Sequence, residues 1–188
     1  DDFSPVLLKG KDSVGTELMF CSNRKVGGFS NSKASFDNTY FLDLYKVISA
    51  DSSVKANLIK STKTKYHDGP ICFSNQGTVM YLTRNNFIDG KKRKDKKGHM
   101  NLKLFIATKQ GEEWSKLKEF KYNSDQFSLG HASVTENGKT MYFVSDMPGT
   151  TGETDIFKSE LTDTGWAKPI NISGVNTSEK ELFPFITE

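Results

Sequence analysis

Three stretches of the chain are near copies of one another: Thr16-Glu-Leu-Met-Phe-Cys-Ser-Asn23, Thr78-Val-Met-Tyr-Leu-Thr-Arg-Asn85 and Lys139-Thr-Met-Tyr-Phe-Val-Ser-Asp146. Each is a short apolar run of the kind that forms a buried β-strand. The glycines before the second and third copies, Gly77 and Gly138, lie 61 residues apart (138 − 77). A period of roughly 50–60 residues is typical of a four-stranded propeller blade. The repeat therefore predicts an all-β fold built from similar sheets.

The third copy shows the plan of one sheet most clearly. Asn137-Gly138 is a hairpin signal, because both residues tolerate the positive φ angles of a tight turn. Both faces of the following run are apolar, which indicates a strand covered on both sides. We expect four strands here, at 130–135, 139–145, 155–161 and 166–172. By analogy, the second copy predicts strands at 69–73, 79–83, 102–108 and 114–120, and the first at 5–8, 17–22, 42–49 and 54–59.

The predicted fold class is therefore all-β: a β-propeller fragment of about three four-stranded antiparallel blades plus the first strand of a fourth. We expect blade 1 at 1–65, blade 2 at 66–128, blade 3 at 129–181, and the first strand of a further blade at 182–188. Because propellers close with about 4–8 blades, we expect this chain to be a piece of a longer protein or to pack on something else. A start at Asp1 without an initiator Met favours a processed or excised piece.

The repeats differ mainly in the connection between the second and third strands. It runs from 145 to 155 in the third repeat (10 residues), from 84 to 103 in the second (19) and from 22 to 43 in the first (21). Insertions that collect on one face of a repeat protein often mark its binding face. The candidate partner-binding residues are therefore the two loop aromatics and the basic run: Phe29, Phe36, Lys91, Lys92, Arg93, Lys94, Lys96 and Lys97. The alternatives are a mobile surface loop around the aromatics and a solvated loop around the lysines.

Charge is concentrated in the second of these loops, 87–99. The whole chain carries a net charge of +3, whereas Lys91-Lys-Arg-Lys-Asp-Lys-Lys97 alone carries +5, which leaves −2 for the remainder. An acidic protein surface or an anionic lipid head group would suit this run. Nucleic acid is not expected, because no aromatic residue alternates with the lysines, although Phe87 lies nearby. No apolar run approaches the length of about 18 residues of a membrane helix, so no transmembrane segment is expected.

Residues for catalysis or metal binding form no recognisable motif. His67, His99 and His131 do not lie at ligand spacing with one another or with cysteine, so neither a metal nor a cofactor is expected. The repeated position of His67 and His131 favours packing or a hydrogen bond to a neighbouring blade. Cys21 and Cys72 fit two buried free thiols, although one disulfide stays open.

Three carboxylates precede predicted first strands: Asp68, Asp125 and Glu181. They fit caps and turns at the strand starts. The alternative is an acid pair near a central channel, as in glycosidases built on propellers.

The third repeat also carries a longer signature, which includes Glu136-Asn-Gly-Lys-Thr-Met-Tyr-Phe-Val-Ser-Asp-Met-Pro-Gly149, Gly152-Glu-Thr-Asp-Ile-Phe157 and Asn176-Thr-Ser-Glu-Lys-Glu-Leu-Phe-Pro-Phe185. It resembles the WD-like propeller repeat of TolB and, more closely, of OmpA-family proteins of the Bacteroidetes. The resemblance is strong over 123–188, moderate over 63–122 and weak before that.

The resemblance implies a non-enzymatic scaffold that is periplasmic and associated with the outer membrane, as in lipoproteins of type IX secretion and gliding assemblies. The implied partner is a cell-envelope protein, such as an outer-membrane barrel protein. Peptidoglycan would be bound only through a domain that these residues do not include. The alternative is the propeller of an enzyme, either a glycosidase or the gating domain of a prolyl-peptidase-like hydrolase.

Overall fold

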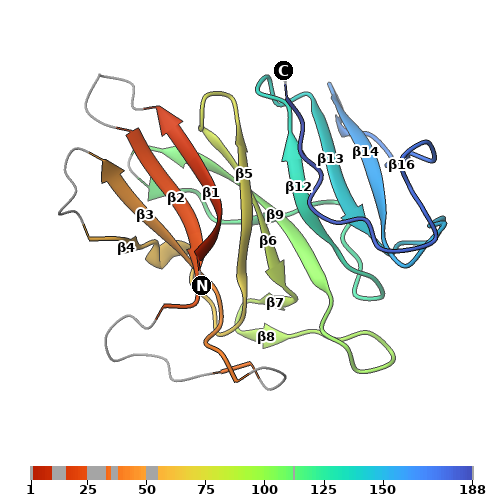
Figure 1. The fold of residues 1–188 in the computed structure, drawn as a ribbon, viewed down its shortest axis with the longest axis horizontal. Coiled ribbons are helices and arrows are strands. Elements are labelled where there is room, and N and C mark those ends of the chain that lie inside the picture. Colours follow the sequence, from red (N-terminus) through yellow and green to blue (C-terminus); the bar gives the residue numbers. More distant parts are fainter. Residues whose placement is uncertain are drawn as a thin grey trace. The chain divides into compact units, whose positions relative to one another are not determined.

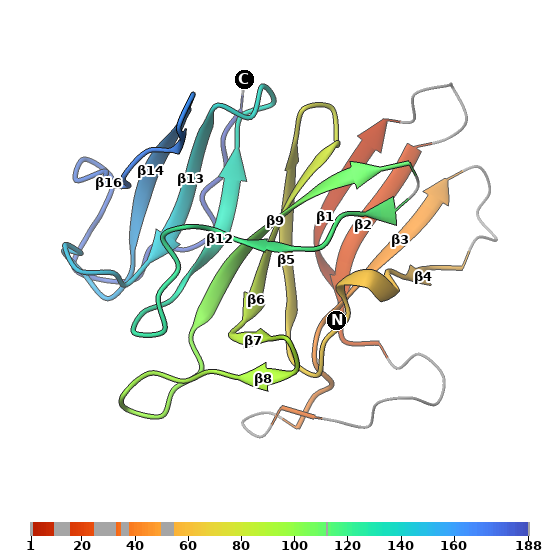
Figure 2. The same ribbon diagram turned by 180° about the vertical axis from the view of Figure 1, so that it is seen from behind.

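The computed structural model describes residues 2–9, 16–24, 33–34, 38–49, 55–111 and 113–187. These residues form antiparallel β-sheets and one short 3-10 helix (Figures 1 and 2). The chain divides into two compact units, residues 1–71 and 72–188, which are described separately below. The predicted all-β class is confirmed.

The first unit holds one four-stranded meander in which each strand pairs antiparallel with the next. Its strands are β1 (Asp2–Lys9), β2 (Thr16–Ser22), β3 (Asp43–Ser49) and β4 (Asn57–Leu58), followed by the 3-10 helix η1 (Lys60–Thr62). The second half of β2 is buried throughout, as the apolar repeat predicts. Its core side chains include Met19, Phe20, Cys21, Leu44 and Tyr45.

Two further sheets follow the same antiparallel plan. The second has the order β10-β9-β6-β5, with β11 also paired to β9, and a separate hairpin joins β7 to β8. The strands are β5 (Asp68–Ser74), β6 (Val79–Asn85), β7 (Phe87–Ile88), β8 (Lys91–Lys92), β9 (Leu102–Gln110), β10 (Glu113–Trp114) and β11 (Lys118–Glu119). The third has the order β12-β13-β14-β15, with β16 also paired to β14. Its strands are β12 (Leu129–Val134), β13 (Thr140–Ser145), β14 (Asp155–Thr162), β15 (Gly165–Trp166) and β16 (Ile170–Asn171).

The first three strands of each sheet lie where the repeat predicts them, but the predicted continuous fourth strand is wrong. In the second and third sheets it is split into two short pieces, β10 with β11 and β15 with β16. In the third sheet Pro169 lies in the gap and has no N–H to donate. In the second, the hydroxyl of Ser115 accepts a hydrogen bond from the backbone N–H of Thr108 at 3.0 Å, so a side chain replaces a ladder bond.

The second and third sheets share one apolar core. Phe120, at the end of the second sheet, lies between Phe143 and Trp166 of the third, with ring centroids 5.8 and 6.2 Å apart. Tyr81 of β6 also contacts Trp166 edge-on, at 6.3 Å. Edge-to-face contacts of this kind add to the free energy gained from apolar burial. The full buried set is Tyr81, Leu104, Phe120, Leu129, Val134, Met141, Phe143, Phe157 and Trp166.

Close backbone approach explains a glycine in two of the first strands. A Cβ added to Gly130 of β12 would lie 2.5 Å from Cγ2 of Thr83 in β6. Within the first unit, a Cβ on Gly69 would lie 2.2 Å from Sγ of Cys21 in β2. Both distances are too short for real atoms, so each site requires glycine. The same strand-to-strand approach therefore recurs in the two units.

A positive φ angle also recurs at one position of the repeat. It occurs at Ser4 (53°) in β1 and at His131 (51°) in β12, and again at Phe183 (52°), 52 residues after His131 (183 − 131). In β1 and β12 the pairing register shifts at this point, between Phe3 and Val6 and between Gly130 and Ser133, as at a β-bulge. Residues 182–187 form no strand, so their assignment as the first strand of a further blade stays a prediction.

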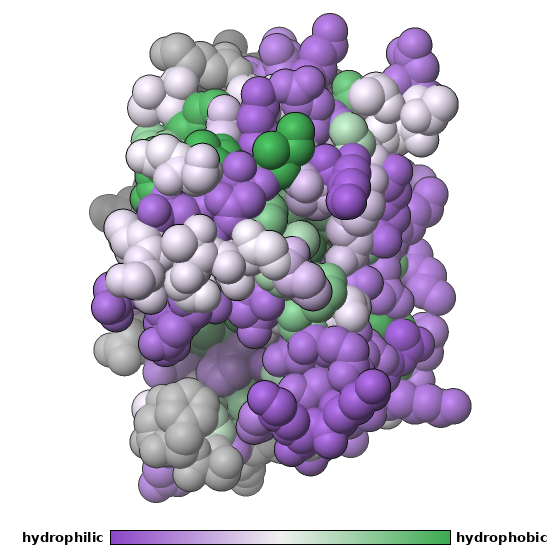
Figure 3. Space-filling view, turned by 90° about the vertical axis from the view of Figure 1, so that its right-hand side faces the viewer, coloured by the Kyte–Doolittle hydropathy of each residue, from purple (hydrophilic) through white to green (hydrophobic). Residues whose placement is uncertain are grey.

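Exposed apolar side chains gather in the last part of the chain. Among the described residues, the large exposed ones after residue 160 are Leu161, Ile170, Val175, Leu182, Phe183 and Phe185. The side of the molecule nearest β14 and β16 is a mixture of hydrophilic and neutral residues with hydrophobic ones scattered among them (Figure 3). Phe183 stacks on His131 with ring centroids 4.1 Å apart, which holds the end of the chain against the third sheet.

Candidate protein-binding surface

The basic run forms a defined hairpin between β6 and β9 of the second sheet. Phe87 pairs with Lys92 and Ile88 with Lys91. The turn between these pairs is Asp89-Gly90, where φ is 48° and 76°. Two consecutive positive φ angles are the geometry of the type I′ turn, which Asp-Gly favours. The loop predicted from sequence over 87–99 therefore contains a hairpin, and its local signal is the Asp-Gly pair between two apolar and two basic residues.

Asn86 holds the root of the hairpin. Its side chain is fully buried, and its backbone N–H donates to the carbonyl of Asn101 at 3.0 Å. Its carbonyl accepts the backbone N–H of Arg93 at 3.0 Å, and its Nδ2 donates to Oδ1 of Asp125 at 2.8 Å. These bonds tie both ends of the insertion to the sheet, so the lysines are presented by an ordered backbone.

Asp95 organises the far turn of the same insertion. Its Oδ1 accepts hydrogen bonds from the backbone N–H groups of Lys97 and His99, both at 2.8 Å. Its Oδ2 lies 3.3 Å from Nδ1 of His99. Desolvation acts to raise the pKa of Asp95, but the hydrogen bonds from His99 and Lys97 outweigh it and hold that pKa below its usual value. The only acid in the run is therefore used inside the turn.

All six predicted basic residues are exposed and lie together on this hairpin and turn: Lys91, Lys92, Arg93, Lys94, Lys96 and Lys97. The guanidinium of Arg93 lies 3.8 Å from the carboxylate of Glu119. Four of the lysines have no hydrogen bond or ion pair to their side chains from the described residues: Lys91, Lys94, Lys96 and Lys97. Those four charges are available to a partner.

A buried ion pair lies where β9 begins, directly after the insertion. The Lys103 side chain is only 1% exposed, and its Nζ lies 3.2 Å from Oδ1 of Asp125, which is 43% exposed. Burial lowers the pKa of Lys103, and Asp125 opposes that shift. The pKa of Asp125 is itself lowered, first by the hydrogen bond from Asn86 and then by Lys103. This pair was missed from sequence, because the repeat places an aspartate, Asp155, at the position of Lys103.

The β6–β9, β11–β12 and β13–β14 connections of the second unit lie at one end of its sheets (Figure 1). The β6–β9 insertion contacts the β11–β12 connection through Asn86 and Asp125. The latter connection is bonded in turn to the β13–β14 connection, since the backbone N–H of Ser128 donates to Oδ1 of Asp146 at 2.6 Å. In the first unit, Phe29 and Phe36 lie outside the described residues.

Two asparagines that the sequence analysis did not select fasten these connections to the sheets. Asn123 accepts the N–H of Leu104 at 3.0 Å and donates to its carbonyl at 2.8 Å. Asn176 makes the same two bonds with Ile156, at 2.8 and 3.0 Å. Each side-chain amide thus bonds both the N–H and the carbonyl of one strand residue, as the backbone of a neighbouring strand would. The available signal is that the two asparagines lie 53 residues apart (176 − 123), each after the fourth strand of its sheet.

The three candidate carboxylates are all used in turns. Asp68 is fully buried and accepts the N–H of Thr64 at 2.6 Å. Glu181 accepts the N–H of Thr177 at 3.0 Å, and Asp125 forms the ion pair described above. The bonds of Asp68 and Glu181 are those of the cap-and-turn interpretation, whereas Asp125 pairs with a side chain of β9.

His67 and His131, which lie near the starts of β5 and β12, take part in packing or in a hydrogen bond between sheets. Nδ1 of His67 accepts the N–H of Leu42 at 3.3 Å, and its ring contacts Phe41 edge-on at 4.8 Å. The backbone N–H of His131 donates to Oγ1 of Thr83 in the second sheet at 2.9 Å. Among the described residues, no group of His, Cys, Asp or Glu side chains is placed to hold a metal ion.

Both cysteines carry free thiols. Burial is the first cause that raises the pKa of Cys21 and of Cys72, each to about 12. Such thiols are poor nucleophiles at neutral pH, because only the thiolate reacts. This agrees with the interpretation as small buried apolar groups.

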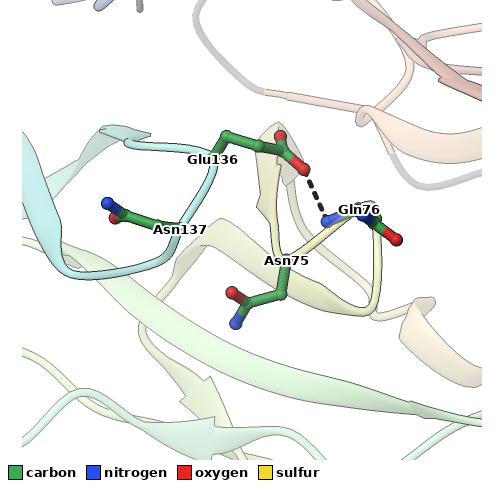
Figure 4. Close-up of a pocket in the computed structure, with 4 residues that line it drawn as sticks. All are labelled: Asn75, Gln76, Glu136 and Asn137. Atoms are coloured by element: carbon green, nitrogen blue, oxygen red, sulfur yellow. Dashed lines mark hydrogen bonds between the residues drawn. The ribbon is translucent and has the colours of Figure 1, made fainter.

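A polar hollow of about 520 Å³ lies at the opposite end of the second unit, between the turns β5–β6 and β12–β13 (Figures 1 and 4). It is lined by Asn75, Gln76, Glu136 and Asn137. The carboxylate of Glu136 accepts the N–H of Gln76 at 2.6 Å, and its carbonyl accepts that of Asn75 at 2.6 Å. Its polar groups thus join two turns of neighbouring sheets.

No protein-family model matches this chain, and no curated protein matches it either. The family resemblance of the third repeat therefore stays a prediction. No helix among the described residues has the length and apolar character needed to cross a membrane.

Proposed function

We propose that this chain is a non-enzymatic protein-binding module, built as a β-propeller fragment, whose loop-bearing end docks a protein partner in the cell envelope. The observation that carries the proposal is the ordered insertion of the second sheet. It is fixed at its root by Asn86 and presents four lysines whose ammonium groups have no partner among the described residues. An ordered loop loses less conformational entropy on binding than a mobile one.

The propeller is supported by three successive sheets of the same antiparallel order and by the recurring glycine contact between a first strand and the second strand before it. Sheets that pack face to face in this way would leave their connections free for recognition. Periplasmic, outer-membrane-associated placement, in a type IX secretion or gliding-like assembly, follows from the resemblance of the third repeat alone.

The proposal is tested by in-cell crosslinking followed by identification of the captured protein. The variant to compare replaces residues 87–99 by a short Gly-Ser linker, which leaves β6 and β9 paired. Loss of one identified envelope protein from the variant, with an unchanged far-ultraviolet circular dichroism spectrum, supports the proposal. Capture of the same proteins by both forms would overturn it.

A substitution in the β5–β6 turn, at the other end of the sheets, is the matched control. Replacing Asn75-Gln76 by Gly-Gly alters the polar hollow and leaves the hairpin intact. The identified protein should still be captured by this variant. If it were lost from the control and kept by the hairpin variant, the binding surface would lie at the hollow instead.

A further inference from the structure

Some charged and N–H groups of the basic insertion already bond within the fold, and those that do not indicate the chemistry of its partner. We infer that the insertion 86–101, which contains the β7–β8 hairpin, binds an acidic polypeptide segment. The binding groups are the ammonium groups of Lys91, Lys94, Lys96 and Lys97. The inference rests on the proposed function and names the chemistry of the partner at that same site.

Two arrangements give phosphate recognition a fixed geometry, and in this insertion each already has a partner within the fold. The first is the guanidinium fork, which binds phosphate through two parallel hydrogen bonds. The only guanidinium of the run, that of Arg93, lies against the carboxylate of Glu119 at 3.8 Å. The second is a nest of backbone N–H groups. Those of Lys97 and His99 already bond to Asp95 at 2.8 Å.

What remains is a set of flexible point charges on a fixed backbone. An ammonium group on a long side chain pairs with a carboxylate without demanding one geometry. No aromatic residue lies between the lysines in the sequence to stack on a base, and Phe87, four residues before Lys91, is half-buried in the hairpin. A segment that binds a membrane surface has exposed apolar side chains beside its lysines. Phe87 and Ile88 are half-buried, so a lipid surface is less suitable as the partner.

Charge complementarity with the rest of the chain also favours a foreign acidic segment. The carboxylates near the hairpin are engaged within the fold: Asp89 lies 3.5 Å from Lys116, Asp95 closes the turn, and Asp125 pairs with Lys103. The four lysines are therefore not neutralised by these neighbours. Attraction between exposed charges falls as salt rises, because the screening length shortens from about 10 Å at 0.1 M to about 3 Å at 1 M.

The test measures binding of a labelled decaglutamate peptide to the whole chain by fluorescence anisotropy. The wild type should bind, with an affinity that falls steeply with added NaCl. The variant K91Q/K94Q/K96Q/K97Q should bind at least about tenfold more weakly, since each exposed charge pair contributes a fraction of the total. The matched control, K60Q/K65Q/K121Q/K168Q, removes four other exposed lysines and the same net charge, and should bind as the wild type does.

Two further arms separate the other anionic partners. Vesicles containing phosphatidylglycerol and a single-stranded oligothymidylate are titrated under the same conditions. Tighter binding of either one than of the peptide, lost in the hairpin variant, would overturn the inference in favour of that class. Equal loss in the hairpin and control variants would also overturn it, because net charge alone would then explain binding.

Failure of the acidic-partner inference can be distinguished from failure of the proposed function. If the crosslinked envelope protein were lost with 87–99 but retained by the four-glutamine variant, the hairpin would bind a protein without using these charges. The proposed function would then stand, and the acidic partner would be wrong.

Discussion

The first and second sheets neutralise the same buried position with opposite charges. In the first unit, Asp43 begins β3 and forms an ion pair with Lys63, which follows the last strand of that sheet. In the second unit, Lys103 occupies the corresponding place in β9 and pairs with Asp125, which follows the last strands of its own sheet. The acid is the inner member in one sheet, and the base is the inner member in the other.

In the third sheet the corresponding position also holds a charged residue, and its charge is compensated by hydrogen bonds. Asp155 stands there, opposite Ser145, and is fully buried. It accepts the N–H groups of Thr151 and Gly152 at 2.7 and 3.2 Å and the side-chain amide of Asn171 at 2.5 Å. Desolvation acts to raise the pKa of Asp155, but these bonds lower it overall. The fold thus requires compensation of a buried polar group here, whatever its sign.

The pairs differ in how far the inner charge is removed from water. The Lys103 side chain is 1% exposed, against 12% for Asp43, while the outer partners are 43% and 31% exposed. A more deeply buried charge costs more when its partner is lost. Four predictions test this comparison, from the largest expected effect to the smallest.

Removal of the outer partner in the second sheet should have the largest effect. We expect Asp125→Ala to lower the free energy of unfolding by about 3 kcal/mol, because it leaves the buried Lys103 without its partner. This is the low end of the range for broken buried pairs, since the site is open to water on the side of Asp125. Both tryptophans, Trp114 and Trp166, lie in the second unit, so urea unfolding followed by tryptophan fluorescence measures this change.

The double variant Lys103→Met/Asp125→Ala should recover most of that loss, since an apolar side chain of similar length carries no desolvation cost. Asp163→Ala, at an exposed turn, serves as the control and should change stability little. If the double variant were as unstable as the single one, the cost would arise from the bonds of Asp125 to Asn86 rather than from Lys103.

Close packing of the second and third sheets should rank next. Gly130→Ala places a Cβ 2.5 Å from Cγ2 of Thr83, and we expect a loss of about 2 kcal/mol from overpacking. Thr83→Ser removes that methyl group and keeps the hydroxyl that accepts the N–H of His131. The pair Gly130→Ala/Thr83→Ser should therefore be more stable than Gly130→Ala alone. Equal stability of the two in urea unfolding would show that the contact relaxes elsewhere.

The ion pair of the first sheet should matter less than that of the second. We expect Lys63→Ala to cost about 1 kcal/mol, because both members retain contact with water. The first unit has no tryptophan, so hydrogen exchange of the β2 and β3 amides is the suitable measurement. A loss as large as that of Asp125→Ala would contradict the ranking by burial.

A pH effect at His131 should be the smallest of the four. Burial lowers the pKa of this imidazole below its unfolded value, so the folded state favours the neutral ring. The contribution of neutral His131 to the free energy of unfolding is fully present above the unfolded-state pKa of about 6.5. It is lost as the pH falls toward the pKa of the folded state. The difference in melting temperature between wild type and His131→Gln should therefore change between about pH 7.5 and 5.5. A constant difference over that range would contradict it.

The sequence predicted nine of the strands within a few residues, because each carries an apolar run bounded by turn residues. It did not predict the interruption of the fourth strands, since the hydrogen bond from Thr108 to Ser115 depends on a side chain meeting the facing strand. Nor did it reveal that the run 91–97 stands on a hairpin rooted by Asn86, which requires the contact with Asp125, 39 residues later.

The amino-acid sequence by itself determined the antiparallel sheets, their turns and the concentration of positive charge in one insertion, because apolar patterning, glycine and lysine act through local geometry and composition. Only the tertiary structure decided that the inner charge of the second sheet is Lys103, that Gly130 lies against Thr83, and that Arg93 and Asp95 are already engaged. Those facts depend on which residues meet across sheets and connections, and a buried charge or a close contact gains its energy only there.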